Sequence, residues 1–311
     1  MLLQQVLGIY DLLDDPGITG QKVAQYFKDL NPDTEISVKT IEGEEGSTDF
    51  LKLIFPGQES EGSARPPSTL GIVGRLGGVG ARPEQLGTVS DADGAIVALA
   101  CAAKLATMAQ RGDLLPGKVI VTTHICPDAP TAPHDPVPFM GSPVDIKTMN
   151  EQEIDPEMDG VLSVDATKGN KVINENGFAI SPTVKDGYIL QVSEDLLEVM
   201  NLISGARPVT FPITTPDITP YGNGLHHINS ILQPATATDS PVVGVATTSG
   251  ATVPGSYTGV NYPTELEKAA RFCCEIAKRF GSRKCKLYDR DQFEKIRSLY
   301  GSMKKLQTPG E

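Results

Sequence analysis

Four side chains with catalytic or ligand-binding chemistry lie in or near apolar segments of this 311-residue sequence. Arg75 ends the run Leu-Gly-Ile-Val-Gly-Arg, and His124 comes near the end of Val-Ile-Val-Thr-Thr-His-Ile. Asp91 and Asp93 lie between these two runs, in Ser-Asp-Ala-Asp-Gly. Carboxylates and imidazoles bind metals and accept protons, whereas a guanidinium binds anions. These residue types indicate a site for a polar ligand, with Asp93 and His124 as candidate catalytic groups.

The segment 70–127 is predicted to position these residues as a strand, a Gly-rich turn, a helix and a second strand. Ile96, Leu99 and Ala103 recur at helical spacing. The β-branched run 118–125 is typical of a strand buried in a parallel sheet. In open α/β sheets, ligands bind outside the carboxyl ends of the strands, where this βαβ unit places its polar residues.

Apolar strands alternate with amphipathic helices along the remainder of the chain. This order predicts a single domain, residues 1–311, with a three-layer α/β/α fold around a mixed, mostly parallel central sheet. Residues 57–69 are rich in Gly, Ser, Glu and Pro and are expected to form a mobile loop. Six prolines are expected to keep residues 126–144 in a stiff, irregular loop. A final short helix and tail are expected over residues 286–311.

The composition argues against several classes of protein. A net charge of −12 disfavours nucleic acids and anionic membranes as partners, because both select basic surfaces. No apolar run reaches the roughly 18 residues that span a bilayer, and the N-terminus lacks the pattern of a signal peptide. The five cysteines include no Cys-x-x-Cys pair, which favours reduced thiols. We therefore expect a cytoplasmic protein with no nucleic-acid or membrane partner.

With its elements in this order, the chain resembles the co-catalytic zinc aminopeptidases of the glutamyl and tetrahedral type, within the zinc exopeptidases. Arg75-Leu-Gly-Gly-Val-Gly lies where that family typically has His-x-Asp-Glu-x-Gly. Asp91 matches the bridging aspartate of the family. Asp165, in an Asp-Ala-Thr strand end, matches a further metal ligand. The chain also resembles an uncharacterised bacterial and archaeal family of unknown function.

Other positions depart from the pattern of the peptidases. Their Glu-Glu pair is replaced by His124 and Ile125, and their last histidine ligand is replaced by Asn261. His226 and His227 occupy a Gly-rich helix start that lies near the substrate in the related peptidases. The resemblance implies that Asn261 and these two histidines, like the arginine of the first motif, contact the ligand.

Two aspartates thus survive while both histidine ligands and both glutamates are replaced, which implies an eroded dimetal site. In one alternative, Arg75 has replaced the metal and pairs with Asp91 or Asp165. The cleft then needs no cofactor, and its arginine binds a small peptide or an amino-acid-like ligand through a carboxylate.

In the other alternative, one weakly bound zinc ion is held by Asp91, His124 and Asp165. The protein would then be a mononuclear hydrolase of the aminopeptidase or amidohydrolase type. A guanidinium is always charged and repels a dication a few ångströms away, which favours the first alternative.

The resemblance also allows a homo-oligomer as the state of the protein, because relatives of this fold often form homo-oligomers.

Overall fold

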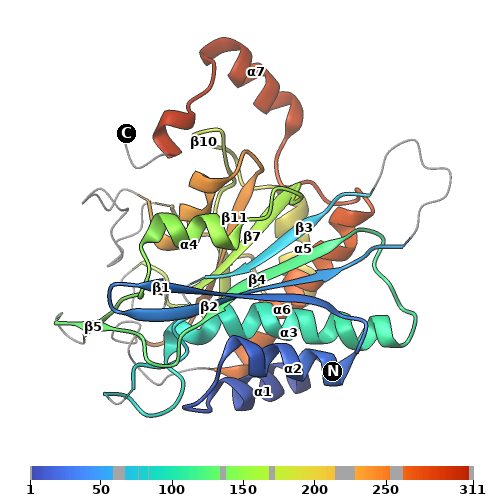
Figure 1. Ribbon diagram of the computed structural model, residues 1–311. Coiled ribbons are helices and arrows are strands. Elements are labelled where there is room, and N and C mark those ends of the chain that lie inside the picture. Colours follow the sequence, from blue (N-terminus) through green and yellow to red (C-terminus); the bar gives the residue numbers. More distant parts are fainter. Residues whose placement is uncertain are drawn as a thin grey trace.

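The computed structural model describes residues 2–58, 67–75, 77–82, 84–133, 138–167, 172–213, 228–252 and 262–307. Its helices and strands follow one another along the chain as Figure 1 shows. In order they are α1 (Leu2–Leu13), α2 (Gly20–Leu30), β1 (Glu35–Gly43), β2 (Gly46–Phe55), β3 (Leu70–Gly74), the 3-10 turn η1 (Ser90–Ala92), α3 (Asp93–Gln110), β4 (Val119–Ile125), β5 (Thr131–Ala132), β6 (Phe139–Met140), α4 (Ile146–Glu153), β7 (Gly160–Ala166), β8 (Gly177–Ile180), β9 (Val184–Lys185), β10 (Tyr188–Ile189), α5 (Glu194–Ser204), η2 (Ser230–Ala237), β11 (Val242–Thr248), α6 (Pro263–Gly281), α7 (Arg290–Tyr300) and η3 (Lys304–Gln307).

A mixed sheet, nine-stranded within the described residues, forms the middle layer of the protein. Its strand order is β1-β2-β4-β3-β7-β11-β9-β10, and β8 pairs with β11 beside this path. The central strands β4, β3, β7 and β11 run parallel, whereas the outer strands are antiparallel additions. The predicted βαβ unit is confirmed, since β3 and β4 are parallel neighbours and α3 connects them.

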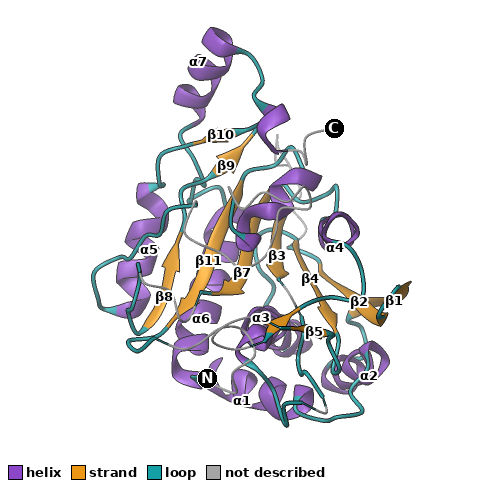
Figure 2. Cartoon of the chain, turned by 90° about the vertical axis from the view of Figure 1, so that its left-hand side faces the viewer, coloured by secondary structure: helices purple, strands orange, loops and turns teal. Residues whose placement is uncertain are grey.

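Helices cover both faces of this sheet, which confirms the predicted layering (Figure 2). The helices α3 and α6 pack on one face, with α1 packed on these two helices, and α4 and η2 pack on the other face. In α3, side chains such as Ile96 and Leu99 are fully buried, and burying each stabilises the fold by about 1.5–3 kcal/mol.

The helix α3 also bears on the question of a membrane span. With η1 it forms a continuous helical segment, Ser90–Gln110, that is long and apolar enough to cross a membrane by length and composition alone. Yet 78% of its most apolar window is buried inside the protein, as expected for the core helix of a sheet protein. The described residues hold no other helix of this kind.

A glycine allows α3 to begin close to the sheet. A Cβ atom on Gly94 would lie 2.5 Å from the carbonyl oxygen of Val164 and 2.6 Å from that of Arg75. Any larger residue would push the helix away from the strand ends. The absence of a side chain therefore brings η1 with Asp91, and the N-terminus of α3 with Asp93, against the carboxyl ends of β3 and β7.

The Pro-rich loop is more regular than predicted. Its residues Thr131 and Ala132 pair with Met140 and Phe139 in the short antiparallel ladder of β5 and β6. The expectation that prolines forbid regular structure over 126–144 is therefore wrong. The paired positions are not prolines, and the carbonyl of Pro130 accepts a hydrogen bond from Gly141 N–H at 2.8 Å. A proline lacks only the donor, so it can still close such a ladder.

Parts of three predicted segments lie outside the described residues. They are 59–66 in the 57–69 loop, 134–137 in the Pro-rich loop and 308–311 at the C-terminus.

Candidate functional site

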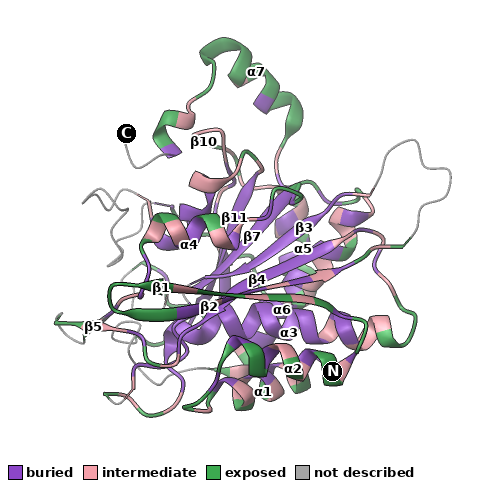
Figure 3. Ribbon diagram, viewed as in Figure 1, coloured by how far each residue is buried: buried purple, intermediate pink, exposed green. Residues whose placement is uncertain are grey.

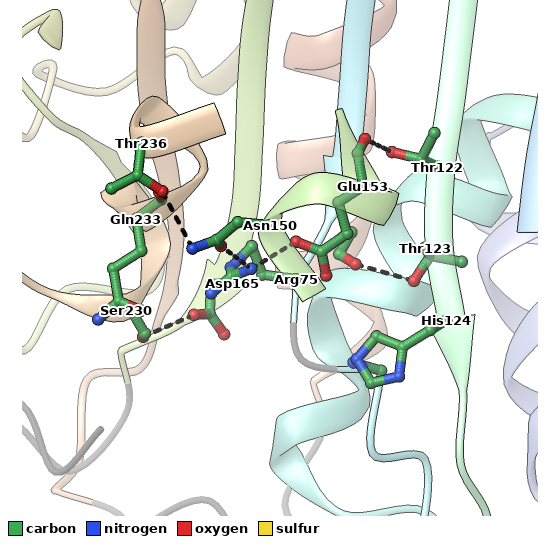
Figure 4. Close-up of polar contacts among 12 residues, drawn as sticks. Arg75, Thr122, Thr123, His124, Asn150, Glu153, Asp165, Ser230, Gln233 and Thr236 are labelled. Atoms are coloured by element: carbon green, nitrogen blue, oxygen red, sulfur yellow. Dashed lines mark hydrogen bonds and ion pairs between the residues drawn. The ribbon is translucent and has the colours of Figure 1, made fainter. Parts of the chain in front are cut away.

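The carboxyl ends of the parallel strands bring several predicted residues to one edge of the sheet. Strands β3 and β7 are in register at Gly74 and Val164, and Arg75 N–H donates to the carbonyl of Val164 at 2.8 Å. Arg75 and Asp165, the residues that follow this pair, are therefore neighbours. His124 is the second-last residue of the adjacent strand β4 on the other side, as Figure 4 shows.

Arg75 lies wholly inside the protein. Its side chain is fully buried and forms an ion pair with Glu153, which is also fully buried, while its Nη1 donates to Asn150 Oδ1 at 2.8 Å. Both partners belong to α4. The predicted ion pair with Asp91 or Asp165 is thus wrong, because α4 supplies a closer carboxylate above this face of the sheet.

The guanidinium uses only part of its hydrogen-bonding capacity. Within the described part of the chain, Nε and Nη2 of Arg75 have no hydrogen-bond partner, and neither has Oε1 of Glu153. A buried unsatisfied donor costs roughly 1–3 kcal/mol. Two N–H donors and one carboxylate oxygen are therefore buried here without a partner among the described residues.

The helix α4 that carries this carboxylate is itself fixed by polar contacts. Asp145 caps it, accepting from Thr148 N–H at 2.9 Å. Thr122 of β4 donates to the backbone carbonyl of Glu153 at 2.6 Å. Burial raises the pKa of the Glu153 carboxyl, and the charge of Arg75 opposes this shift. The sequence analysis missed Glu153, and its one local signal was the Asp-x-x-Thr cap that starts α4.

His124 has both ring nitrogens engaged. Its Nε2 accepts a hydrogen bond from Gly77 N–H at 2.9 Å, so that nitrogen carries no proton. Its Nδ1 lies 2.8 Å from Thr48 Oγ1, and this hydroxyl donates to the carbonyl of Ile125 at 3.2 Å, so Nδ1–H is the donor to Thr48. Burial, helped by the positive charge of Arg75, lowers the pKa of His124 to about 3. The ring is therefore neutral and offers no lone pair to a metal or a proton.

The aspartates lie around the same edge. Asp165 is buried and accepts from Ala166 N–H at 2.7 Å and from the Ser230 hydroxyl at 3.1 Å. Asp93, fully buried at the start of α3, accepts from the Thr247 hydroxyl of β11 at 2.7 Å. Asp91 lies in η1 and is also buried. The fold thus gathers all three carboxylates where the parallel strands end, and their roles stay predictions.

The remaining predicted ligand-binding residues, His226, His227 and Asn261, lie outside the described residues. Their role stays a prediction.

The described residues at this edge do not supply the donor set of a dimetal centre. Such a centre requires about four to six carboxylate or imidazole ligands. Here Arg75 is ion-paired with Glu153, and the lone pair of His124 Nε2 is taken by a backbone N–H. Among the described residues, no group of three or more His, Cys, Asp or Glu side chains has a metal-binding arrangement.

The sheet order, the helices on both faces and the polar edge define an α/β protein with the fold of the zinc exopeptidases. Solved structures support this class. The protein is similar to leucine aminopeptidase of Caenorhabditis elegans, with a TM-score of 0.52 and 11% identity over 92% of this chain and 66% of that one. It is also similar to glutaminyl cyclase of an Acidobacteriales bacterium, with a TM-score of 0.50 and 10% identity over 91% and 94% of the two chains. Such low identities show a shared fold alone.

The chain belongs to the family of proteins of unknown function DUF1177, whose model matches residues 39–310. Comparison with curated proteins found no match. The predicted resemblance to an uncharacterised family with a zinc-exopeptidase-like fold is thereby confirmed.

We expect that removing one partner of the buried ion pair between Arg75 and Glu153 strongly destabilises the protein. Arg75→Met leaves the Glu153 charge buried without its counterion and should lower the free energy of unfolding by about 3–5 kcal/mol. The double variant Arg75→Met/Glu153→Met should recover most of this loss, because it removes both charges. Urea unfolding of the two variants and the wild type measures these differences.

The exposed pair Lys22–Asp15, with side chains 53% and 43% exposed, provides the control. Lys22→Met should cost less than about 1 kcal/mol. If Arg75→Met cost no more than this surface change, the importance assigned to the buried pair would be refuted.

Acidification should destabilise the protein through His124. Its folded-state pKa of about 3 lies below the value of about 6.5 in an unfolded chain. Between these values the unfolded state binds one more proton, so this residue lowers the free energy of unfolding by about 1.4 kcal/mol per pH unit as the pH falls. The variant His124→Gln keeps an acceptor for Gly77 N–H but does not titrate. Its unfolding free energy should therefore fall less steeply than that of the wild type from about pH 6.5 to 4, and equal slopes would contradict a buried neutral His124.

Proposed function

We propose that this protein binds a small amino-acid-like or peptide ligand at the carboxyl edge of its sheet, without a dimetal centre. The observation that carries this proposal is the fully buried Arg75, whose Nε and Nη2 have no hydrogen-bond partner within the described residues. A carboxylate accepts from two guanidinium N–H groups at once, in a planar arrangement. The ligand is therefore recognised through a carboxylate.

The neighbouring charges support a zwitterionic ligand. Asp91, Asp93 and Asp165 lie buried around the same edge of the sheet. Their negative charges attract an amino group, as the guanidinium attracts a carboxylate. The unpartnered Oε1 of Glu153, within the described part of the chain, is an additional acceptor for an ammonium group. The charges favour a free amino acid or a short peptide over a neutral ligand.

Under this proposal, the protein binds its ligand and does not hydrolyse it. The side chain that could have served as a base, His124, stays neutral with both nitrogens engaged. Its low pKa disfavours proton transfer near neutral pH, since a general base works best with a pKa near the operating pH. We keep the cytoplasm as the proposed location, which the five free cysteines support.

The alternative is a mononuclear zinc hydrolase using Asp91, His124 and Asp165. It would require His124 to give up its hydrogen bond from Gly77, and no observation of the described residues favours it. Purified protein should accordingly contain far less than one zinc ion per chain by elemental analysis. Aminopeptidase assays with added Zn²⁺, Mn²⁺ or Co²⁺ should show no activity.

Near-stoichiometric zinc that is lost in both Asp91→Ala and Asp165→Ala would establish the alternative. Metal-dependent hydrolysis abolished by the same two substitutions would do so equally.

Binding of matched ligands tests the proposed function. In calorimetric titrations, dipeptides with a free carboxylate should bind more tightly than the same dipeptides with an amidated C-terminus. Arg75→Lys keeps a positive charge for Glu153 but lacks the paired N–H donors of the guanidinium. It should therefore weaken binding of the free carboxylates by about tenfold or more. The amidated ligands should bind the variant and the wild type alike.

Amidated and free ligands that bind the wild type equally would refute recognition through the carboxylate. The same conclusion would follow if Arg75→Lys, with an unchanged circular-dichroism spectrum, bound free carboxylates as tightly as the wild type.

A further inference from the structure

The last part of the chain projects from the body of the protein. Residues 283–307, which we name the C-terminal arm, contain α7 and η3. Figures 1 and 2 show α7 standing away from the sheet and its covering helices. Figure 3 shows that most of its surface is exposed.

Specific contacts fix the base of the arm on strands β9 and β10. The ring of Phe293 packs edge-on against Tyr188 and Tyr288, with centroids 6.4 and 5.5 Å apart. Arg297 Nε lies 3.4 Å from Asp186 Oδ2. These contacts hold α7 in one orientation, in which its outer surface is exposed.

The arm then returns to the same strands. The Tyr188 hydroxyl donates to the carbonyl of Gly301 at 2.7 Å, and Met303 N–H donates to the carbonyl of Asp186 at 3.1 Å. The buried side chain of Gln307 accepts from Gly187 N–H. The C-terminal arm is therefore attached to the body of the protein both before and after its projecting helix α7.

Large apolar side chains stay exposed on this element. Leu299, Tyr300, Leu306 and the adjoining Ile189 of β10 are 63%, 65%, 55% and 57% exposed. They are four of the nine exposed large hydrophobics among the described residues. Of the residues of α7, all of which are described, Phe293 alone is buried. An 11-residue helix has little stability of its own in water, so a further contact on its outer face would stabilise it.

The charge of the arm indicates what that contact is. The arm carries eight Lys and Arg residues and three Asp and Glu residues, a net charge of +5, which leaves −17 on the rest of the chain. The surface that complements the arm is acidic and partly apolar. A polyanion such as a nucleic acid would have to approach the strongly acidic body, which repels it.

We propose that the arm docks on the acidic body of a second copy of this chain, and that the second copy returns the contact with its own arm. The body of another copy supplies the negative charge, and a reciprocal contact closes into a dimer. Two basic arms facing each other would repel, so each arm crosses to the body of the partner. This proposal is independent of the proposed ligand.

Sedimentation of the full chain tests the dimer. At about 50 μM and low salt the wild type should sediment as a dimer, and raising the salt concentration should weaken it, because screening reduces the attraction between arm and body. Leu299→Gln/Tyr300→Gln keeps the charge and the helix propensity while removing the apolar contact. This variant should raise the dissociation constant about tenfold or more, and Arg290→Glu/Lys295→Glu on α7 should raise it and reduce its dependence on salt.

Leu86→Gln is the matched control, since Leu86 is 79% exposed and lies outside the arm. It should leave the dimer unchanged. A wild type that is monomeric under these conditions would overturn the proposal. A dimer that neither arm variant weakens, or that the control weakens equally, would overturn it as well.

Discussion

The buried ion pair between Arg75 and Glu153 is the constraint on which the candidate site depends. Two opposite charges are fully desolvated between a strand end and α4, so each holds the other in place. The same guanidinium charge helps to keep the neighbouring His124 neutral. It also opposes a dication at this edge, because like charges a few ångströms apart repel strongly in a poorly screened interior. One interaction thus fixes α4 against the strand ends and, together with burial, keeps the histidine neutral.

The fold was largely predictable because its signals are local. The β-branched runs around Ile72 and Val121 predicted the central parallel strands, and the spacing of Ile96 and Leu99 predicted α3. Burial on both faces requires such continuous apolar runs, and a helix buried on nearly all sides shows them as well.

The partners of the site residues were not predictable in this way. Glu153 is 78 residues from Arg75 in the sequence, and it belongs to a short helix that carries no strong local pattern. The state of His124 depends on Thr48, which reaches the ring because β2 pairs antiparallel with β4 in a particular register. Such pairings arise from tertiary packing. The edge at which the polar residues gather was therefore predictable from local patterns, whereas their contacts were not.

Under the proposed function, a comparison of a metal ion with a guanidinium explains why this edge would bind a ligand without hydrolysing it. Both are cations at the carboxyl edge of a parallel sheet, and both attract a carboxylate. A metal ion also lowers the pKa of a bound water and so generates a nucleophile near neutral pH. Arg75 offers donors but no coordination, and its guanidinium cannot take up a proton as a base does. Under the proposed function, an arginine at this edge would preserve recognition of an anion but would supply no activated water for hydrolysis.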